Sequence, residues 1–193
     1  TTGVGAITLK AGVTGTGAGG DAGTANIVLG PLITGTGAIT VHSEGTVQFN
    51  GAVNAGGALT VTSGGNITQT AVLTVAGAAT FAAGSSNNIT LNSANNFSTV
   101  AIASGSNVTL NDTNALDLAA STVSGTLVVT TAGNVTQSGI LTVSGAATFT
   151  AGSSNNITLN SANNFSTVAI ASGSNVTLND TNALDLAAST VSG

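Results

Sequence analysis

The chain has 193 residues and a formal net charge of −5, with one lysine and no arginine, so nucleic acids and anionic membrane surfaces are poor partners because phosphate contacts need Lys and Arg. Charged residues make up 4 % and hydrophobic residues 41 %, a balance that argues against charge-driven disorder and leaves hydroxyls and amides to cover the surface. Cysteine is absent, which excludes disulfides and thiolate metal sites, and no apolar run approaches the roughly 20 residues of a membrane span.

Residues 1–36 are the least regular part of the chain. Residues 5–9 read as a strand, 26–29 and 32–33 as two more, and the glycine-rich stretch 11–25 as a protruding loop. Pro31 lacks an amide donor and belongs at a corner or strand start. We therefore expect one irregular coil in this region.

Residues 37–77 read as two coils of about 20 residues each. Apolar and polar residues alternate in short runs separated by Gly, Asn and Ser, which is typical of half-buried strands joined by turns. The inward-facing candidates are Ile39, Val41, Val47, Phe49 and Val53 in the first coil and Leu59, Val61, Ile67, Leu73 and Val75 in the second.

A tandem repeat occupies the rest of the chain. Residues 72–125 recur at 140–193, shifted by 68 positions, with differences only at Val72/Ile140, Ala76/Ser144 and Ala82/Thr150. Recurring Ser-Gly and Ala-Gly endings divide the repeat into coils of 28, 20 and 20 residues. We therefore interpret 78–145 as a first repeat of three coils and 146–193 as a second, incomplete repeat of two coils. A chain that stops in phase without a polar cap suggests a segment of a longer array.

A unit of this length cannot bury its apolar face alone, whereas stacked units can, which predicts a β-solenoid of about eight coils with 20–28 residues per coil. With strands about 4.8 Å apart, the rod would be roughly 38 Å long and each repeat would add about 14 Å. Phe81 and Phe149 are one repeat apart, as are Phe97 and Phe165, so we expect each pair to lie three coils apart. Asparagines in the turns at 85–88 and 153–156 should form amide ladders between coils.

The segments GNVTQSGILTVSGAATFTAGSSNNITLN (133–160) and SNVTLNDTNALDLAASTVSG (106–125) resemble the repeat region of large bacterial exoproteins of the filamentous haemagglutinin type. Those proteins use two-partner secretion and are related to autotransporter passenger domains. The resemblance covers nearly all of 37–193 and rests on repeat texture. It implies a right-handed parallel β-helix, export across two membranes and display at the bacterial cell surface as an adhesive or matrix fibre.

Catalytic candidates are few. Pectin-cleaving β-helix enzymes need clustered carboxylates or a basic residue, and the acids here include two copies of one pair, Asp112/Asp117 and Asp180/Asp185, together with Asp21 and Glu44. We interpret the pair as turn-forming or solvated. His42-Ser43-Glu44 contains triad-like letters, but neighbours along a strand point to opposite faces, so we expect His42 to be an exposed strand residue.

Three other motifs have both a functional and a structural interpretation. Asp112-Thr-Asn114 and residues 19–23 faintly resemble calcium loops but lack oxygen ligands in consecutive repeats. Asn-x-Ser/Thr sequons at Asn88, Asn96 and Asn107 and at their copies from Asn156 onward could accept glycans, or could supply what the coil needs. Thr-x-Thr pairs at 60/62, 68/70 and 148/150 suggest ice binding, which uses flat ranks of threonine on a β-solenoid. Ala82, however, stands at the position equivalent to Thr150, so we expect the rank to be interrupted.

The sequence therefore predicts a non-enzymatic, extracellular segment of a surface fibre, acting as stalk and adhesive surface in attachment or biofilm, with no metal, cofactor or catalytic residue. Its partners would be neighbouring repeats, other copies and cell-surface or glycan receptors. A second hypothesis is a matrix filament built by lateral or end-to-end association of uncharged solenoids. A polysaccharide-degrading enzyme is the third and weakest.

Overall fold

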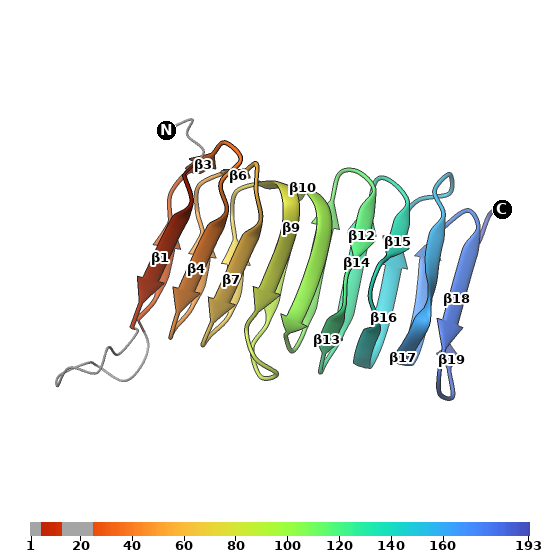
Figure 1. Ribbon diagram of the computed structural model, residues 1–193. Helices are drawn as coiled ribbons and strands as arrows, with labels where there is room; N and C mark the ends of the chain where they lie inside the picture. Colours follow the sequence, from red (N-terminus) through yellow and green to blue (C-terminus); the bar gives the residue numbers. More distant parts are fainter. Residues whose placement is uncertain (1–4, 13–24) are drawn as a thin grey trace.

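The computed structural model describes residues 5–12 and 25–193, and the regular structure in this part of the chain is entirely β (Figure 1). The chain winds into stacked coils of short strands, ordered along the rod from β1 to β19. Their bounds are β1 Ile7–Ala11, β2 Ile27–Leu29, β3 Leu32–Thr34, β4 Ile39–Ser43, β5 Val47–Phe49, β6 Val53–Ala55, β7 Leu59–Ser63, β8 Ile67–Gln69, β9 Leu73–Ala82 and β10 Ile89–Ser104. They continue with β11 Val108–Asp112, β12 Leu116–Leu118, β13 Ser121–Val123, β14 Leu127–Thr131, β15 Val135–Gln137, β16 Leu141–Thr150, β17 Ile157–Ser172, β18 Val176–Asp180 and β19 Asp185–Leu186.

Apart from β18 and β19 in the last coil, the strands pair in parallel with a strand about one coil further along the chain. Ile39 on β4, for example, lies beside Leu59 on β7, 20 positions later. About eight such turns follow one another, which confirms the predicted parallel β-solenoid. Parallel neighbours need a connection that returns to the same end of the sheet, and here the remainder of each coil provides it.

One ladder can be followed through most of the rod. It joins β2, β5, β8, the first residues of β10, then β11, β14 and the end of β16. A second begins β1, β4, β7 and the end of β9, and a third begins β3, β6 and the start of β9. The long strands β10 and β17 run around the corners of their coils without a break in strand structure.

The register corrects two expectations about coil length. The segments 78–105 and 146–173 are not coils of 28 residues, because Thr74 pairs with Asn96 and Ala79 with Val100, offsets of 22 and 21 positions. The Ala-Gly ending at 76–77 does not interrupt strand structure, since β9 continues through it to Ala82, and β10 runs on from Ile89 to Ser104. A 68-residue repeat therefore makes roughly three and one-third coils of about 20 residues rather than three.

Equivalent residues of the two repeats consequently lie in different ladders. Ala79 continues the ladder of Leu59, whereas its equivalent, Ala147, pairs with Leu127 in the ladder that contains Ile89. The second repeat is thus turned by about one strand, or one third of a coil, around the rod relative to the first.

The core is a continuous aliphatic column inside the coils. All the inward-facing residues predicted for 37–77 are buried, and so are their equivalents in the repeat region. The five phenylalanines are fully buried as well: Phe49, Phe81, Phe97, Phe149 and Phe165. Phe81 and Phe149 do not stack. Instead Phe81 packs edge-on against Phe97 at 6.1 Å between ring centroids, and Phe149 against Phe165 at 6.2 Å.

Strands lie close to the positions expected in the first part of the chain. The first, β1, covers 7–11 rather than 5–9, and β2 and β3 flank Pro31 at a corner. The predicted loop at 11–25 lies for the most part outside the described residues. Within 5–12 and 25–193, no helix is long and apolar enough to span a bilayer.

Candidate functional site

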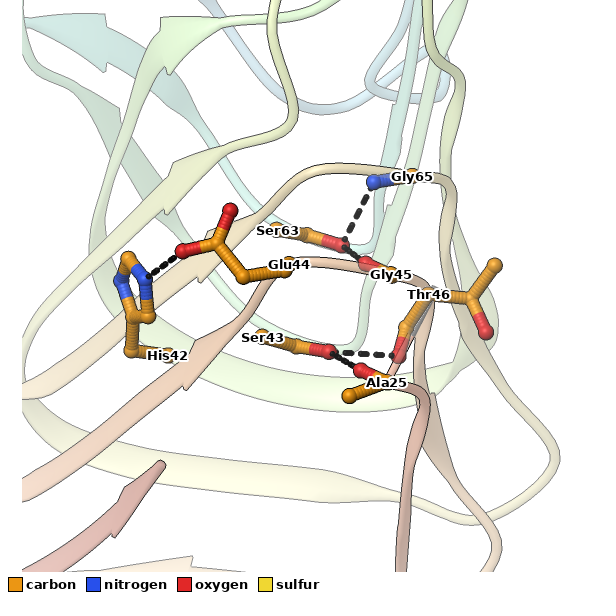
Figure 2. Close-up of polar contacts among 8 residues, drawn as sticks. All are labelled: Ala25, His42, Ser43, Glu44, Gly45, Thr46, Ser63 and Gly65. Carbon is orange, nitrogen blue, oxygen red and sulfur yellow. Dashed lines mark hydrogen bonds and ion pairs between the residues drawn. The ribbon is translucent and has the colours of Figure 1, made fainter. Parts of the chain in front are cut away.

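The triad-like residues His42, Ser43 and Glu44 lie at the carboxyl end of β4 (Figure 2). His42 Nε2 and Glu44 Oε1 are 3.0 Å apart on the solvent side of the coil. Ser43 is buried and points inward, where its Oγ donates to the carbonyl oxygen of Ala25 at 2.5 Å, with the carbonyl of Thr46 at 3.2 Å as a second acceptor. The predicted alternation is confirmed, so the imidazole faces away from this hydroxyl.

A second serine shows what Ser43 does in the fold. Ser63 lies beside Ser43 on the next coil, and its Oγ donates to the carbonyl of Gly45 at 2.7 Å while accepting from the backbone N–H of Gly65 at 3.3 Å. Figure 2 shows the two hydroxyls in the same position on successive coils. Both hydroxyls therefore add side-chain hydrogen bonds at a corner where main-chain hydrogen bonds already join the coils, such as that from the N–H of Gly65 to the carbonyl of Gly45 at 2.9 Å.

The predicted carboxylate pair does not converge on one site. Asp112 ends β11 and is buried, whereas Asp117 lies on β12 between two inward-facing leucines and so points outward. Asp117 accepts hydrogen bonds from the hydroxyls of Thr136 at 3.3 Å and Ser138 at 2.5 Å on the next coil. The two acids therefore lie on opposite sides of the wall of the coil.

Asp112 closes the turn between β11 and β12. Its Oδ1 accepts from the backbone N–H of Phe97 at 2.7 Å and its Oδ2 from that of Asn114 at 3.3 Å. Burial raises the pKa of this carboxyl above its ordinary value, although the backbone N–H groups of Phe97, Asn114 and Thr113 act in the opposite direction. Asp180 repeats the contact, since its Oδ1 accepts from the N–H of Phe165 at 2.8 Å.

A buried amide pair in the wall of the rod was not predicted from the sequence. Asn95 is fully buried, and its amide exchanges two hydrogen bonds with Gln69, at 2.7 and 3.0 Å. Asn95 also accepts from the N–H of Leu73 and donates to the carbonyls of Leu91 and Asn111. The pair recurs 68 positions later as Asn163 and Gln137. The available signal was an amide in phase with inward-facing residues: Gln69 stands two positions after Ile67, and Asn95 two positions before Phe97.

The calcium-like segments gain no support from the geometry. Both carboxylate oxygens of Asp112 face backbone N–H donors, which a cation would have to displace. No group of three or more His, Cys, Asp or Glu residues that could hold a metal ion occurs among the described residues. Residues 19–23 lie outside them.

The predicted asparagine ladder is confirmed. Asn88 Oδ1 accepts from both the backbone N–H and the Nδ2 of Asn107 on the next coil, each at 3.1 Å, and Asn156 makes the same contacts with Asn175. The sequon asparagines Asn88, Asn96 and Asn107 are exposed. Glycan attachment at these positions stays a prediction.

The threonine rows differ from the expected pattern. Thr80-x-Ala82 and Thr148-x-Thr150 lie in different ladders, so the alanine does not interrupt a rank that contains Thr150. One rank is continuous over four coils and consists of Thr8, Thr40, Thr60 and Thr80. The neighbouring line is mixed, with Lys10, His42, Thr62 and Ala82. A flat two-rank threonine surface is therefore absent from this ladder between β1 and β9.

Stacked parallel coils, a dry aliphatic column and polar groups that pair with the next coil define a β-solenoid repeat protein. A family model described as "Repeats of unknown function (DUF5649)" matches residues 36–104 and 105–172, which together make up more than half of the chain. The protein therefore belongs to this family. No curated protein and no solved structure matches it.

Proposed function

We propose that the chain is a non-enzymatic structural segment of a large bacterial surface fibre, in which the number of repeats sets the length of a stiff stalk. The observation that carries the proposal is the continuity of the rod. The buried apolar column runs from Leu29 to Ile170, and parallel ladders join each coil to the next. A rod of this kind lengthens by copying a unit, and its stiffness comes from inter-coil hydrogen bonds and the packed core.

The extracellular location and the filamentous haemagglutinin type of fibre come from the resemblance described for residues 37–193, which is based on the segments 106–125 and 133–160. Two features are compatible with such a setting: cysteine is absent, and the fold is one that can grow coil by coil.

Immunogold electron microscopy of intact producing cells, with an antibody raised against the repeat, tests this proposal. We expect label on the outer surface, and its loss after brief protease treatment of the intact cells. Label that is found only inside the cells, or only after lysis, would refute the surface role. Adhesion is a separate claim, which is checked by binding of the purified segment to host cells and to matrix glycans.

The alternative, a self-assembling matrix filament, is favoured by the charge distribution. Outward positions such as Thr60 and Thr80, and Thr122 and Thr142, are uncharged neighbours on successive coils, so two rods can approach there without repulsion. Exposed apolar residues such as Val28 and Ile140 add contact area. Electron microscopy at high and low concentration, in low and high salt, separates the hypotheses. Single rods favour a stalk, and bundles or filaments longer than one chain favour a matrix.

A further inference from the structure

The loops at 83–88 and 151–156, here called the brace loops, occupy equivalent positions in the two repeats. Each connects two long strands, β9 to β10 and β16 to β17. Each contains a glycine with a positive φ, Gly84 at 79° and Gly152 at 82°, a backbone conformation that favours glycine. Coils that contain a brace loop are about two residues longer than their neighbours, with offsets of 22 rather than 20 positions.

The brace loop at 83–88 is fixed to the coil before it and to the coil after it. Asn87 Nδ2 donates to the carbonyl of Gly64, one coil earlier, at 3.1 Å and to Ala83 at the base of the loop at 2.8 Å. The carbonyl of Asn87 accepts from the N–H of Ser106, one coil later, at 2.7 Å.

One contact reaches further. Ser124 Oγ, two coils after the loop, donates to the carbonyl of Ser85 at 2.6 Å. The second repeat reproduces the arrangement: Ser192 Oγ donates to Ser153 at 2.7 Å and Asn155 Nδ2 to Ala132 at 3.3 Å. Main-chain ladders join only adjacent coils, so the serine bond is of a different kind because it skips a coil.

We propose that each brace loop ties four successive coils together and resists their separation when the rod is pulled along its axis. A bond that spans two inter-coil interfaces must break before either interface opens fully. The biological role of the brace loops depends on the proposed stalk function. The pulling experiment that tests the brace itself does not.

The rotation of each repeat by about one third of a coil determines on which edge of the rod its brace loop lies. Because a repeat makes about three and one-third coils, successive brace loops lie on successive edges of the rod. Figure 1 shows the loop after β9 at the lower edge and the loop before β17 at the upper edge. Three consecutive repeats would therefore brace all three edges.

The test is single-molecule pulling of the full chain, with the ends attached to the two handles, comparing the wild type with a Ser124→Ala, Ser192→Ala variant. We expect the first opening event at a given force to be about fivefold faster in the variant, which corresponds to about 1 kcal/mol at 1.4 kcal/mol per tenfold. Ser98→Ala, Ser166→Ala is the matched control, since both serines are exposed strand residues in equivalent repeat positions. Ser124→Thr, which keeps the hydroxyl, should restore most of the wild-type rate.

Amide hydrogen exchange on the same proteins adds a readout without force. Exchange at Ser106, whose N–H donates to the brace loop, should also be several-fold faster in Ser124→Ala. Equal opening rates and equal exchange in the variant and the control would overturn the brace. Failure of the surface localisation, with the rate difference intact, would reject only the stalk function.

Discussion

Replacement of Asn95 by alanine should destabilise the rod more than any exposed substitution in β10. Asn95 is fully buried. Its side chain forms hydrogen bonds with Gln69 and Leu73 on the preceding coil and with Asn111 on the following one. The variant leaves the N–H of Leu73 and the Oε1 of Gln69 without this partner inside the wall. Because an unsatisfied buried polar group costs about 1–3 kcal/mol, we expect a loss of about 2–6 kcal/mol.

Urea denaturation followed by circular dichroism measures this loss, with Asn92→Ala as the control, because Asn92 is an exposed residue of the same strand. Asn163→Ala, in the second repeat, should cost less, since Gln137 Oε1 there keeps the N–H of Ser161 as a donor at 3.2 Å. If Asn95→Ala loses no more than Asn92→Ala, the buried amide pair does not hold the coils together and the reasoning fails.

Three further predictions concern the core, the corner and the buried acid. Phe81→Ala and Phe149→Ala should each cost about 3–5 kcal/mol in urea denaturation, and should agree closely because their packing is the same; unequal losses would contradict equivalent interiors. Gly56→Ala should lower the melting temperature sharply because its Cβ would collide with the backbone carbonyl of Gly35, whereas Gly30→Ala meets nothing within 4 Å; similar melting temperatures would disprove the close approach. Because the folded pKa of Asp112 is raised, stability should fall as pH rises through that pKa, and Asp112→Asn should flatten this part of the profile; parallel pH profiles of the two proteins would refute it.

Much of the fold could be predicted because its determinants are local. Alternation in pairs such as Ile39/Val41 and Leu59/Val61 identifies inward positions, and repetition at similar spacing implies stacking. The asparagine ladder at Asn88 and Asn107 followed from the same argument. These inferences need only the period of a strand and the fact that parallel coils align like residues.

The register could not be predicted in the same way. A tandem repeat shows that 68 residues recur, but the number of coils that they form depends on how far strands continue around corners. Gly77 stands at an expected boundary but does not end β9, and β10 continues from Ile89 to Ser104 around its coil, so three apparent coils become about three and one-third. Two other features depend on this register. One is the contact between Phe81 and Phe97, and the other is whether Ala82 lies in the same threonine rank as Thr150.

The buried polar groups were missed for a different reason. Polar residues such as Asn95, Asp112 and Ser43 are normally expected to be exposed to solvent. The alternation of inward and outward positions places them inside the coil only when it is followed from one strand to the next across a turn. Their hydrogen bonds go to backbone groups on neighbouring coils, which the sequence cannot show without the register. Among the described residues, no buried side-chain nitrogen or oxygen lacks a hydrogen-bond partner.

Small-angle X-ray scattering of arrays that contain two, four and six complete repeats tests the central claim most directly. A rod that grows by about three and one-third coils per repeat should lengthen by about 16 Å for each 68 residues, with constant cross-section, because parallel strands lie about 4.8 Å apart. An increment of that size at every step supports a spacer whose length is set by repeat number. A cross-section that grows with repeat number, or a length that does not, would contradict a continuous β-solenoid.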